Sequence, residues 1–200
     1  MRMSAIEKFF VNGRWRERRS EALARNLLSC LDLRAGLEVL DAGCGSGAAA
    51  RYIARTYDVH VTAIDVDPDQ VALAASRTAT AERVTFVEAD ARLLPFEDRR
   101  FDVVLSFMTL HHIADWRAAV GDFGRVLRSG GHLLLADLAL PRPLAKVIAA
   151  FGHEPPSVAR LLTEVRASGL VPIDRQSSRG PFLGRYEAIF EKAPSPLQSD

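Results

Sequence analysis

Cysteine is scarce in this sequence: among its 200 residues only Cys30 and Cys44 carry a thiol. Two thiols supply neither a disulfide framework nor the three or four closely spaced ligands of a tetrahedral zinc site, so we expect no metal site. We also expect the protein to reside in a reducing compartment, the cytoplasm. A continuous apolar run is lacking too. The longest apolar region, residues 132–151, is interrupted by charged side chains and two prolines, which predicts no membrane span, and no secretion signal is expected at the start.

An excess of charge of one sign is also lacking. The formal net charge is +1, which predicts no nucleic-acid partner and no attraction to an anionic membrane. The arginines of residues 14–19 are diluted by Glu17 and Glu21, which indicates a solvated face and not an RNA contact. With 48% apolar residues the chain can fill one core, so we expect a single folded unit that is a monomer or a homodimer.

Short apolar segments recur along the chain. They are near-continuous and not alternating, a pattern typical of parallel strands that helices cover on both faces. The expected strands are 37–40, 59–64, 84–89, 101–108 and 132–137. Helix signals separate these strands, and such alternation predicts an α/β fold with a doubly wound sheet.

Two of the helix signals are specific. Residues 67–70, DPDQ, combine an N-cap carboxylate, a proline at the first helical position and a glutamine three residues after the cap, so a helix should run from there toward Thr78. Asp115 is expected to cap a second helix whose apolar stripe extends to Leu127.

The pattern changes after Pro141. Residues 144–151 carry one apolar stripe at helical spacing, and a further helix is expected over 157–167. Segments 170–176 and 185–192 then predict an antiparallel pair, in which Pro172 cannot donate to a ladder and so marks an edge strand. Residues 193–200 are expected to form a disordered tail.

Glycines at positions 43, 45 and 47 directly follow the first strand. Such a turn lets a ligand approach the backbone and meet free N–H groups at a helix N-terminus, where an anionic group is favoured. Asp65 ends the second strand, where a doubly wound fold places a carboxylate on a ribose. Because Gly43, Gly45 and Ala48 also satisfy the dinucleotide fingerprint, the spacing alone leaves an NAD-dependent oxidoreductase open.

Five ordered motifs resemble those of the class I S-adenosylmethionine (SAM) methyltransferases, in the small branch similar to ubiquinone and menaquinone biosynthesis methyltransferases. They are VLDAGCGSG (39–47), AIDVDPDQV (63–71), VEADARLLPF (87–96), FDVVLSFMTLHHI (101–113) and RVLRSGGHLLLAD (125–137). The resemblance covers about residues 37–192. It implies SAM as the cofactor and a Rossmann-like sheet of seven strands, with an antiparallel last strand inserted next to the edge.

The resemblance also implies a role for each matching residue. Asp41 would hold the amino group of the methionyl moiety indirectly, and Asp65 would bind the ribose hydroxyls. The other implied cofactor contacts are Gly43, Gly45 and Gly47 under the methionyl part, Val66 on the adenine, Asp90 and the backbone of Ala91 at the adenine amino group, and the chain around Ser106 and Phe107 beside the methionyl moiety.

Methyl transfer from a sulfonium disperses positive charge, so catalysis comes mainly from holding the acceptor and the methyl group in line with water excluded. An acceptor that must lose a proton needs a base. His112 and His111 follow the fourth strand at the ligand-binding end of the sheet and are the candidates, with His112 ahead by resemblance. Either could instead cap or pack against the next helix. Cys44 is expected to fill space and not to act as a nucleophile.

Two segments could cover the site. Residues 9–15 could line a lid over the cofactor, or the N-terminal region could only dock a helix on the sheet. The stripe of 144–151 could roof an acceptor pocket, or it could only pack in the core. The expected organisation is a helical segment (1–35), a SAM-binding domain (36–192) and the tail (193–200).

These observations predict a SAM-dependent methyltransferase that acts on a small, apolar acceptor. Three other functions stay open, because a fold and a cofactor do not name a reaction. They are methylation of RNA or protein, regulation by SAM binding without catalysis, and NAD-dependent oxidoreduction. Salt-sensitive binding would favour RNA, and binding of NAD without SAM would favour the oxidoreductase.

Overall fold

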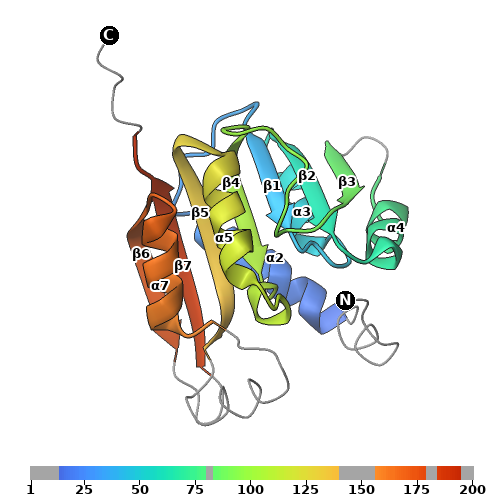
Figure 1. Ribbon diagram of the computed structural model, residues 1–200. Helices are drawn as coiled ribbons and strands as arrows, with labels where there is room; N and C mark the ends of the chain where they lie inside the picture. Colours follow the sequence, from blue (N-terminus) through green and yellow to red (C-terminus); the bar gives the residue numbers. More distant parts are fainter. Residues whose placement is uncertain (1–13, 80–82, 140–155, 179–183, 195–200) are drawn as a thin grey trace.

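The computed structural model describes residues 14–79, 83–139, 156–178 and 184–194. Seven strands form one sheet in the order β3-β2-β1-β4-β5-β7-β6 (Figure 1). The strands are β1 (Glu38–Ala42), β2 (His60–Asp65), β3 (Val84–Glu88), β4 (Phe101–Phe107), β5 (Leu127–Ala139), β6 (Leu170–Ser178) and β7 (Gly184–Lys192). The helices are α2 (Arg14–Leu28), α3 (Ala48–Thr56), α4 (Pro68–Ser76), α5 (Trp116–Val126), α7 (Val158–Ala167) and the 3-10 turn η1 (Leu110–His112).

The pairing of the strands confirms the predicted doubly wound α/β sheet. β1 is parallel to both β2 and β4, and β3 and β5 extend the sheet in parallel on either side. β7 runs antiparallel between β5 and β6, so the last strand is inserted next to the edge, as expected. Pro172 lies in the edge strand β6, where the register with β7 shifts between Pro172 and Asp174.

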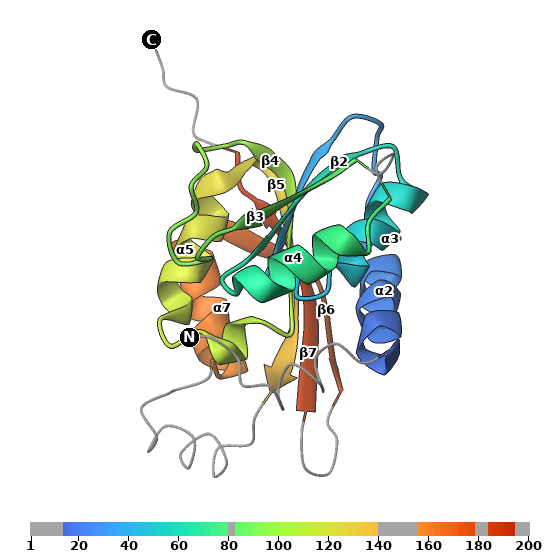
Figure 2. The same cartoon turned by 90° about the vertical axis from the view of Figure 1, so that its right-hand side faces the viewer.

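Helices cover both faces of the sheet, with α2 and α3 on one side and α5 and α7 on the other (Figure 2). Within β4, Val104 packs in the core under α5, while Val103 and Leu105 pack in the core under α2 and α3. Because both faces are buried, the strand needs apolar side chains at successive positions and not at alternate ones. α2 docks through Leu23 and Leu27, as its apolar spacing predicts.

The predicted caps form, with one difference. Asp67 Oδ1 accepts from the N–H of Asp69 at 3.0 Å, and Asp115 Oδ1 accepts from the N–H of Ala118 at 3.2 Å. Gln70 does not complete a capping box, because the N–H of Asp67 donates to Asp65 at 3.0 Å. The start of α4 is thus tied to the end of β2.

The boundary between α5 and β5 corrects the sequence prediction. Leu127 is expected to end the helical stripe, but α5 ends at Val126 and Leu127 begins β5, where it pairs with Phe101. Gly130 adopts a φ of +74°, and the register with β4 shifts between Phe101 and Val103, so the glycine pair is accommodated inside the strand. A single buried leucine fits a helix or a strand equally well, so the sequence pattern could not separate them.

Several predicted features lie outside the described residues: positions 9–13 of the possible lid, the stripe of 144–151 and the tail beyond 194. Trp15 lies within the described residues and is 70% exposed. In the described part of the chain, no helix is both long and apolar enough to cross a membrane.

Candidate active site

The glycine turn connects β1 to α3 at the carboxyl edge of the sheet. Gly43 and Gly47 have φ values of +84° and +74°, which L side chains rarely adopt. A Cβ on Gly43 would collide with the Thr109 side chain, and one on Gly47 would lie 2.9 Å from both Ala74 and Phe86. Two of the three glycines are therefore required by the packing of the protein itself.

Most backbone N–H groups of the turn have acceptors inside the protein. Gly43 and Cys44 both donate to the carbonyl of Ile64, at 2.9 and 2.8 Å, and Gly47 donates to Cys44 at 2.9 Å. Gly45 donates to Asp65 Oδ2 at 2.9 Å. These four N–H groups are therefore already bonded within the protein, whereas the free N–H groups predicted from the sequence belong to the N-terminus of α3.

Asp65 joins the turn to the end of β2. Its two oxygens accept from different N–H groups, Oδ2 from Gly45 and Oδ1 from Asp67. Burial raises the pKa of Asp65, and these N–H groups oppose the rise. Since a carboxylate has about four acceptor positions, lone pairs remain on both oxygens. The half-buried carboxylate is thus held in a defined orientation and can still accept two hydroxyl groups.

Asp41 is buried in β1, at 3% exposure, and its Oδ2 has no hydrogen-bond partner among the described residues. Burial, with the nearby charge of Asp65, raises the pKa of Asp41 from 3.8 to about 7, and the N–H of Ala50 opposes the rise. A buried carboxylate without a counter-charge is unfavourable, and an ammonium group would satisfy both its charge and its open acceptor. Asp41 therefore fits the amino group of a methionyl moiety.

The residues that the resemblance assigns to the adenine follow β2 and β3. Val66 is 47% exposed directly after Asp65, and Ala91 is 7% exposed after β3. Asp90 lies beside them, but its carboxylate accepts from Arg92 Nε at 3.0 Å on both oxygens and from Nη2 at 2.6 Å. This pairing lowers the pKa of Asp90. A role for Asp90 at the adenine thus requires Arg92 to release part of the carboxylate.

The end of β4 faces the glycine turn. Ser106 and Phe107 are 1% and 8% exposed, so both residues are buried in the structure. Met108 follows with a φ of 57°, an unusual value for a residue other than glycine. Thr109 then packs against Gly43, and its hydroxyl donates to the Gly43 carbonyl at 3.4 Å. Cys44 is half-buried, and burial raises the pKa of its thiol, as expected for a side chain that fills space.

The two histidines of η1 differ in their surroundings. His111 Nδ1 lies 2.5 Å from Asp137 Oδ1, and the backbone N–H of His111 donates to Asp137 Oδ2 at 3.2 Å. Asp137 is 1% exposed near the carboxyl end of β5, and the N–H of Leu138 donates to it as well. His112 is exposed, with its ring 3.9 Å from that of His111. Asp137 therefore orients His111, whereas the prediction from the sequence ranked His112 first as the base.

We predicted no role from the sequence for three residues of this site. They are Asp137, which contacts His111, Thr109, which contacts Gly43, and Glu17, which contacts Ser46. The signal for Asp137 was present, because it is a single carboxylate at the end of an apolar strand. Thr109 and Glu17 carry no comparable signal. Their importance arises from contacts with Gly43 and Ser46, which are distant in the sequence.

Comparison with known proteins gives consistent results. Residues 40–135 match the family described as methyltransferase domain. The chain is 40% identical over 140 residues to an O-methyltransferase of Aspergillus nomiae, covering 68% of this chain and 62% of that protein. It is 42% identical over 131 residues to the 27-O-demethylrifamycin SV methyltransferase of Amycolatopsis mediterranei, covering 64% and 48% respectively.

Among solved structures, the cyclase SpnF has a similar fold, with a TM-score of 0.77 at 22% identity over 92% of this chain and 84% of that one. This likeness concerns the fold alone. The chain spans 62% and 48% of the length of the two curated relatives, so it matches only part of each of them. The family match includes the glycine turn, Asp41, Asp65 and both histidines. The chain therefore belongs to the class I S-adenosylmethionine-dependent methyltransferases.

Proposed function

We propose that the protein transfers the methyl group of SAM to a hydroxyl oxygen of a small, apolar acceptor. The observation that carries the proposal is the pair of carboxylates beside the glycine turn. Asp41 is buried with an open acceptor atom, and Asp65 is oriented with lone pairs on both oxygens. An ammonium group and a ribose diol supply the charge and the donors that these two carboxylates lack.

The cofactor supplies a methyl group on a sulfonium sulfur, which leaves as a neutral thioether. Asp41 and Asp65 would hold the two ends of the methionyl-ribose portion, and the exposed Val66 would pack on the adenine. Positioning of this kind, with water excluded, contributes up to roughly 7–11 kcal/mol in well-oriented systems.

His111 removes the proton of the acceptor hydroxyl at Nε2. Its Nδ1–H donates to Asp137, which fixes the tautomer and leaves the lone pair on Nε2. The buried carboxylate of Asp137 then stabilises the imidazolium, as in other carboxylate–histidine pairs. The names of the two relatives, both acting on oxygen, agree with an acceptor that must lose a proton.

The remaining expectations stay part of the proposal. We place the protein in the cytoplasm as a monomer or homodimer with no nucleic-acid partner, with residues 1–35 as a helical segment and 36–192 as the SAM-binding domain. A fold that is shared with a protein named a cyclase does not determine the reaction. The decisive test must therefore measure methyl release and not binding alone.

Calorimetry with S-adenosylhomocysteine (SAH), SAM and NAD tests the cofactor, and transfer of a tritiated methyl group into cell extract tests the reaction. We expect binding of SAM and SAH, no binding of NAD, and a labelled small molecule that partitions into organic solvent. Label in RNA or protein would replace the acceptor class. Binding of SAM without any labelled product would leave a SAM-binding regulator as the better description.

A further inference from the structure

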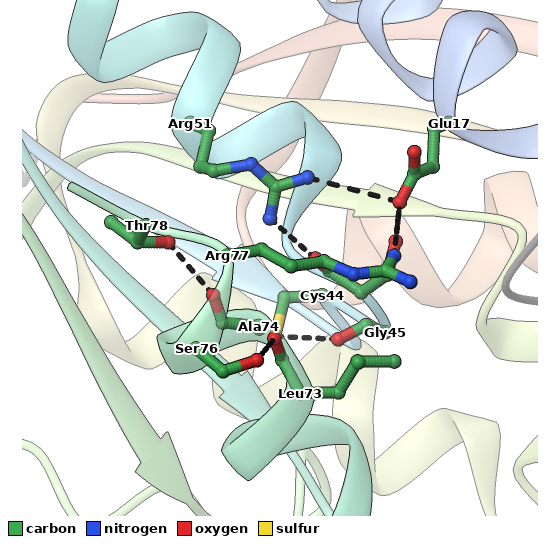
Figure 3. Close-up of polar contacts among 10 residues, drawn as sticks. Glu17, Cys44, Gly45, Arg51, Leu73, Ala74, Ser76, Arg77 and Thr78 are labelled. Carbon is green, nitrogen blue, oxygen red and sulfur yellow. Dashed lines mark hydrogen bonds and ion pairs between the residues drawn. The ribbon is translucent and has the colours of Figure 1, made fainter. Parts of the chain in front are cut away.

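The carboxylate of Glu17 in α2 contacts three segments beside the proposed cofactor site: the glycine turn, α3 and the end of α4. Glu17 Oε1 accepts from Ser46 Oγ of the glycine turn at 3.1 Å and from Arg77 Nη1, at the end of α4, at 2.5 Å. Arg51 of α3 places Nη2 3.8 Å from the same oxygen. Figure 3 shows the two guanidinium groups reaching Glu17 from different elements.

These contacts hold Ser46 from both ends. Its hydroxyl donates to Glu17, and its carbonyl accepts from Arg51 Nη1 at 2.6 Å. Ser46 lies between Gly45, whose N–H binds Asp65, and Gly47, which caps α3. A change in the position of Ser46 would therefore move the residues on either side of it, including the donor to Asp65.

The cluster is partly shielded from solvent, which strengthens its electrostatics. The side chains of Arg51, Glu17 and Arg77 are 9%, 22% and 37% exposed. Without Glu17, two cations would remain next to the turn without this counter-charge, an unfavourable arrangement at low exposure. The turn would then have to shift or admit water.

α2 also contacts the segment that directly follows β4. Arg19 Nη2 lies 3.9 Å from Met108 Sδ, directly after β4. The first turns of α2 thus reach both the glycine turn and the end of β4, between which the methionyl part would lie. This segment precedes the stretch that matches the family, residues 40–135.

We infer that Glu17 is a positioning residue for the cofactor, which sets the conformation of the glycine turn through Ser46 without touching the ligand. The inference rests on the proposed binding of SAM at this turn. It predicts that α2 contributes to cofactor affinity in addition to its contribution to the stability of the fold.

The test measures the Kd of SAH by calorimetry for Glu17→Ala and Glu17→Gln, at a temperature well below the unfolding midpoint of every variant. A hydrogen bond to a charged group corresponds to about tenfold in affinity, so we expect Glu17→Ala to raise the Kd about tenfold and Glu17→Gln to raise it less. Glu21→Gln is the matched control. It lies one turn later on α2, makes no hydrogen bond or ion pair with the described residues, and should leave the Kd unchanged.

A double-mutant cycle with Ser46→Ala separates positioning from a general loss of packing. If Glu17 acts through Ser46, Glu17→Ala weakens SAH binding much less in the Ser46→Ala background than in the natural one. Arg77→Gln is a second variant that removes one contact of Glu17 and should raise the Kd in the same direction if Glu17→Ala does not fold.

A lowered unfolding temperature for Glu17→Ala with the natural Kd would overturn the inference, because it would limit Glu17 to anchoring α2. The same holds for full additivity with Ser46→Ala. If the unchanged protein itself fails to bind SAH, the proposed function fails and the inference fails with it. Binding by the unchanged protein and by Glu17→Ala alike refutes only the inference.

Discussion

The cofactor half of the site, at the ends of β1 and β2, differs in construction from the acceptor half, at the ends of β4 and β5. In the first, the carboxylates of Asp41 and Asp65 stand at strand ends and retain open acceptor positions. In the second, Asp137 of β5 orients the ring of His111, which lies in η1. Binding groups can thus be recognised from their own position in the chain, whereas the orientation and tautomer of a histidine depend on a partner.

The largest expected effect is on kcat, from a substitution in the acceptor half of the site alone. His111→Ala should lower kcat roughly a hundredfold or more, because the general base is lost, while the Kd of SAH changes little. His112→Ala should leave both quantities near their natural values. Single-turnover methyl transfer and calorimetry on the two variants measure this. A larger loss of kcat in His112→Ala than in His111→Ala would restore the ranking that the sequence alone predicted.

Asp65→Ala breaks the cofactor half. The proposed ribose contacts and the observed bonds to Gly45 and Asp67 would both be lost, so we expect the Kd of SAH to rise about a hundredfold. Calorimetry with SAH and with the ribose analogue 2′-deoxy-SAH measures the effect. The two ligands should differ for the natural protein and become nearly equal for the variant. A persistent difference would mean that another residue binds the ribose.

The pH dependence of SAH binding tests the role of Asp41. Its pKa is about 7 without cofactor, so below pH 7 the cofactor ammonium group must displace a proton. The Kd of SAH should therefore fall as the pH rises toward 7, by up to about tenfold per pH unit, and level off above that. Calorimetry in buffers of different ionisation enthalpy detects the proton release. Asp41→Asn should bind weakly and lose this pH dependence.

The same pKa predicts the stability of the protein without cofactor. Because the pKa of Asp41 is raised from 3.8 to about 7, the folded state holds the proton more tightly than the unfolded state between these values. Stability from this residue is present below pH 3.8 and is lost as the pH rises to about 7. Thermal unfolding should show Asp41→Asn gaining stability relative to the natural protein at about pH 8.

The smallest effect concerns Arg92, which occupies the carboxylate of Asp90. An exposed ion pair contributes about 0–1 kcal/mol, so Arg92→Ala should lower the Kd of SAH no more than about fivefold by freeing Asp90, with little change in unfolding temperature. Asp90→Ala should raise the Kd. If both variants bind SAH as the natural protein does, Asp90 does not contact the adenine.

The fold could be predicted from the sequence because its signals are redundant. Apolar strands, caps at Asp67 and Asp115 and the edge proline Pro172 each indicate the same sheet, and the structure agrees. The start of β5 could not be predicted, since Leu127 suits a helix stripe and a buried strand alike. The glycine turn was located correctly, but four of its N–H groups donate to Ile64, Cys44 and Asp65 of the protein itself, because tertiary packing supplies acceptors that no local pattern shows.

The sequence by itself determined the class of fold, the turn at residues 43–47 and the two carboxylates beside it, because each depends on backbone conformation or on position at a strand end. Only the tertiary structure decided that His111 meets Asp137, and that Glu17 meets Ser46, Arg51 and Arg77. Neighbouring residues in a tight turn face different surroundings, and charged side chains from separate helices converge only after the helices pack on the sheet. Such pairings depend on distances in space, which the order of residues does not specify.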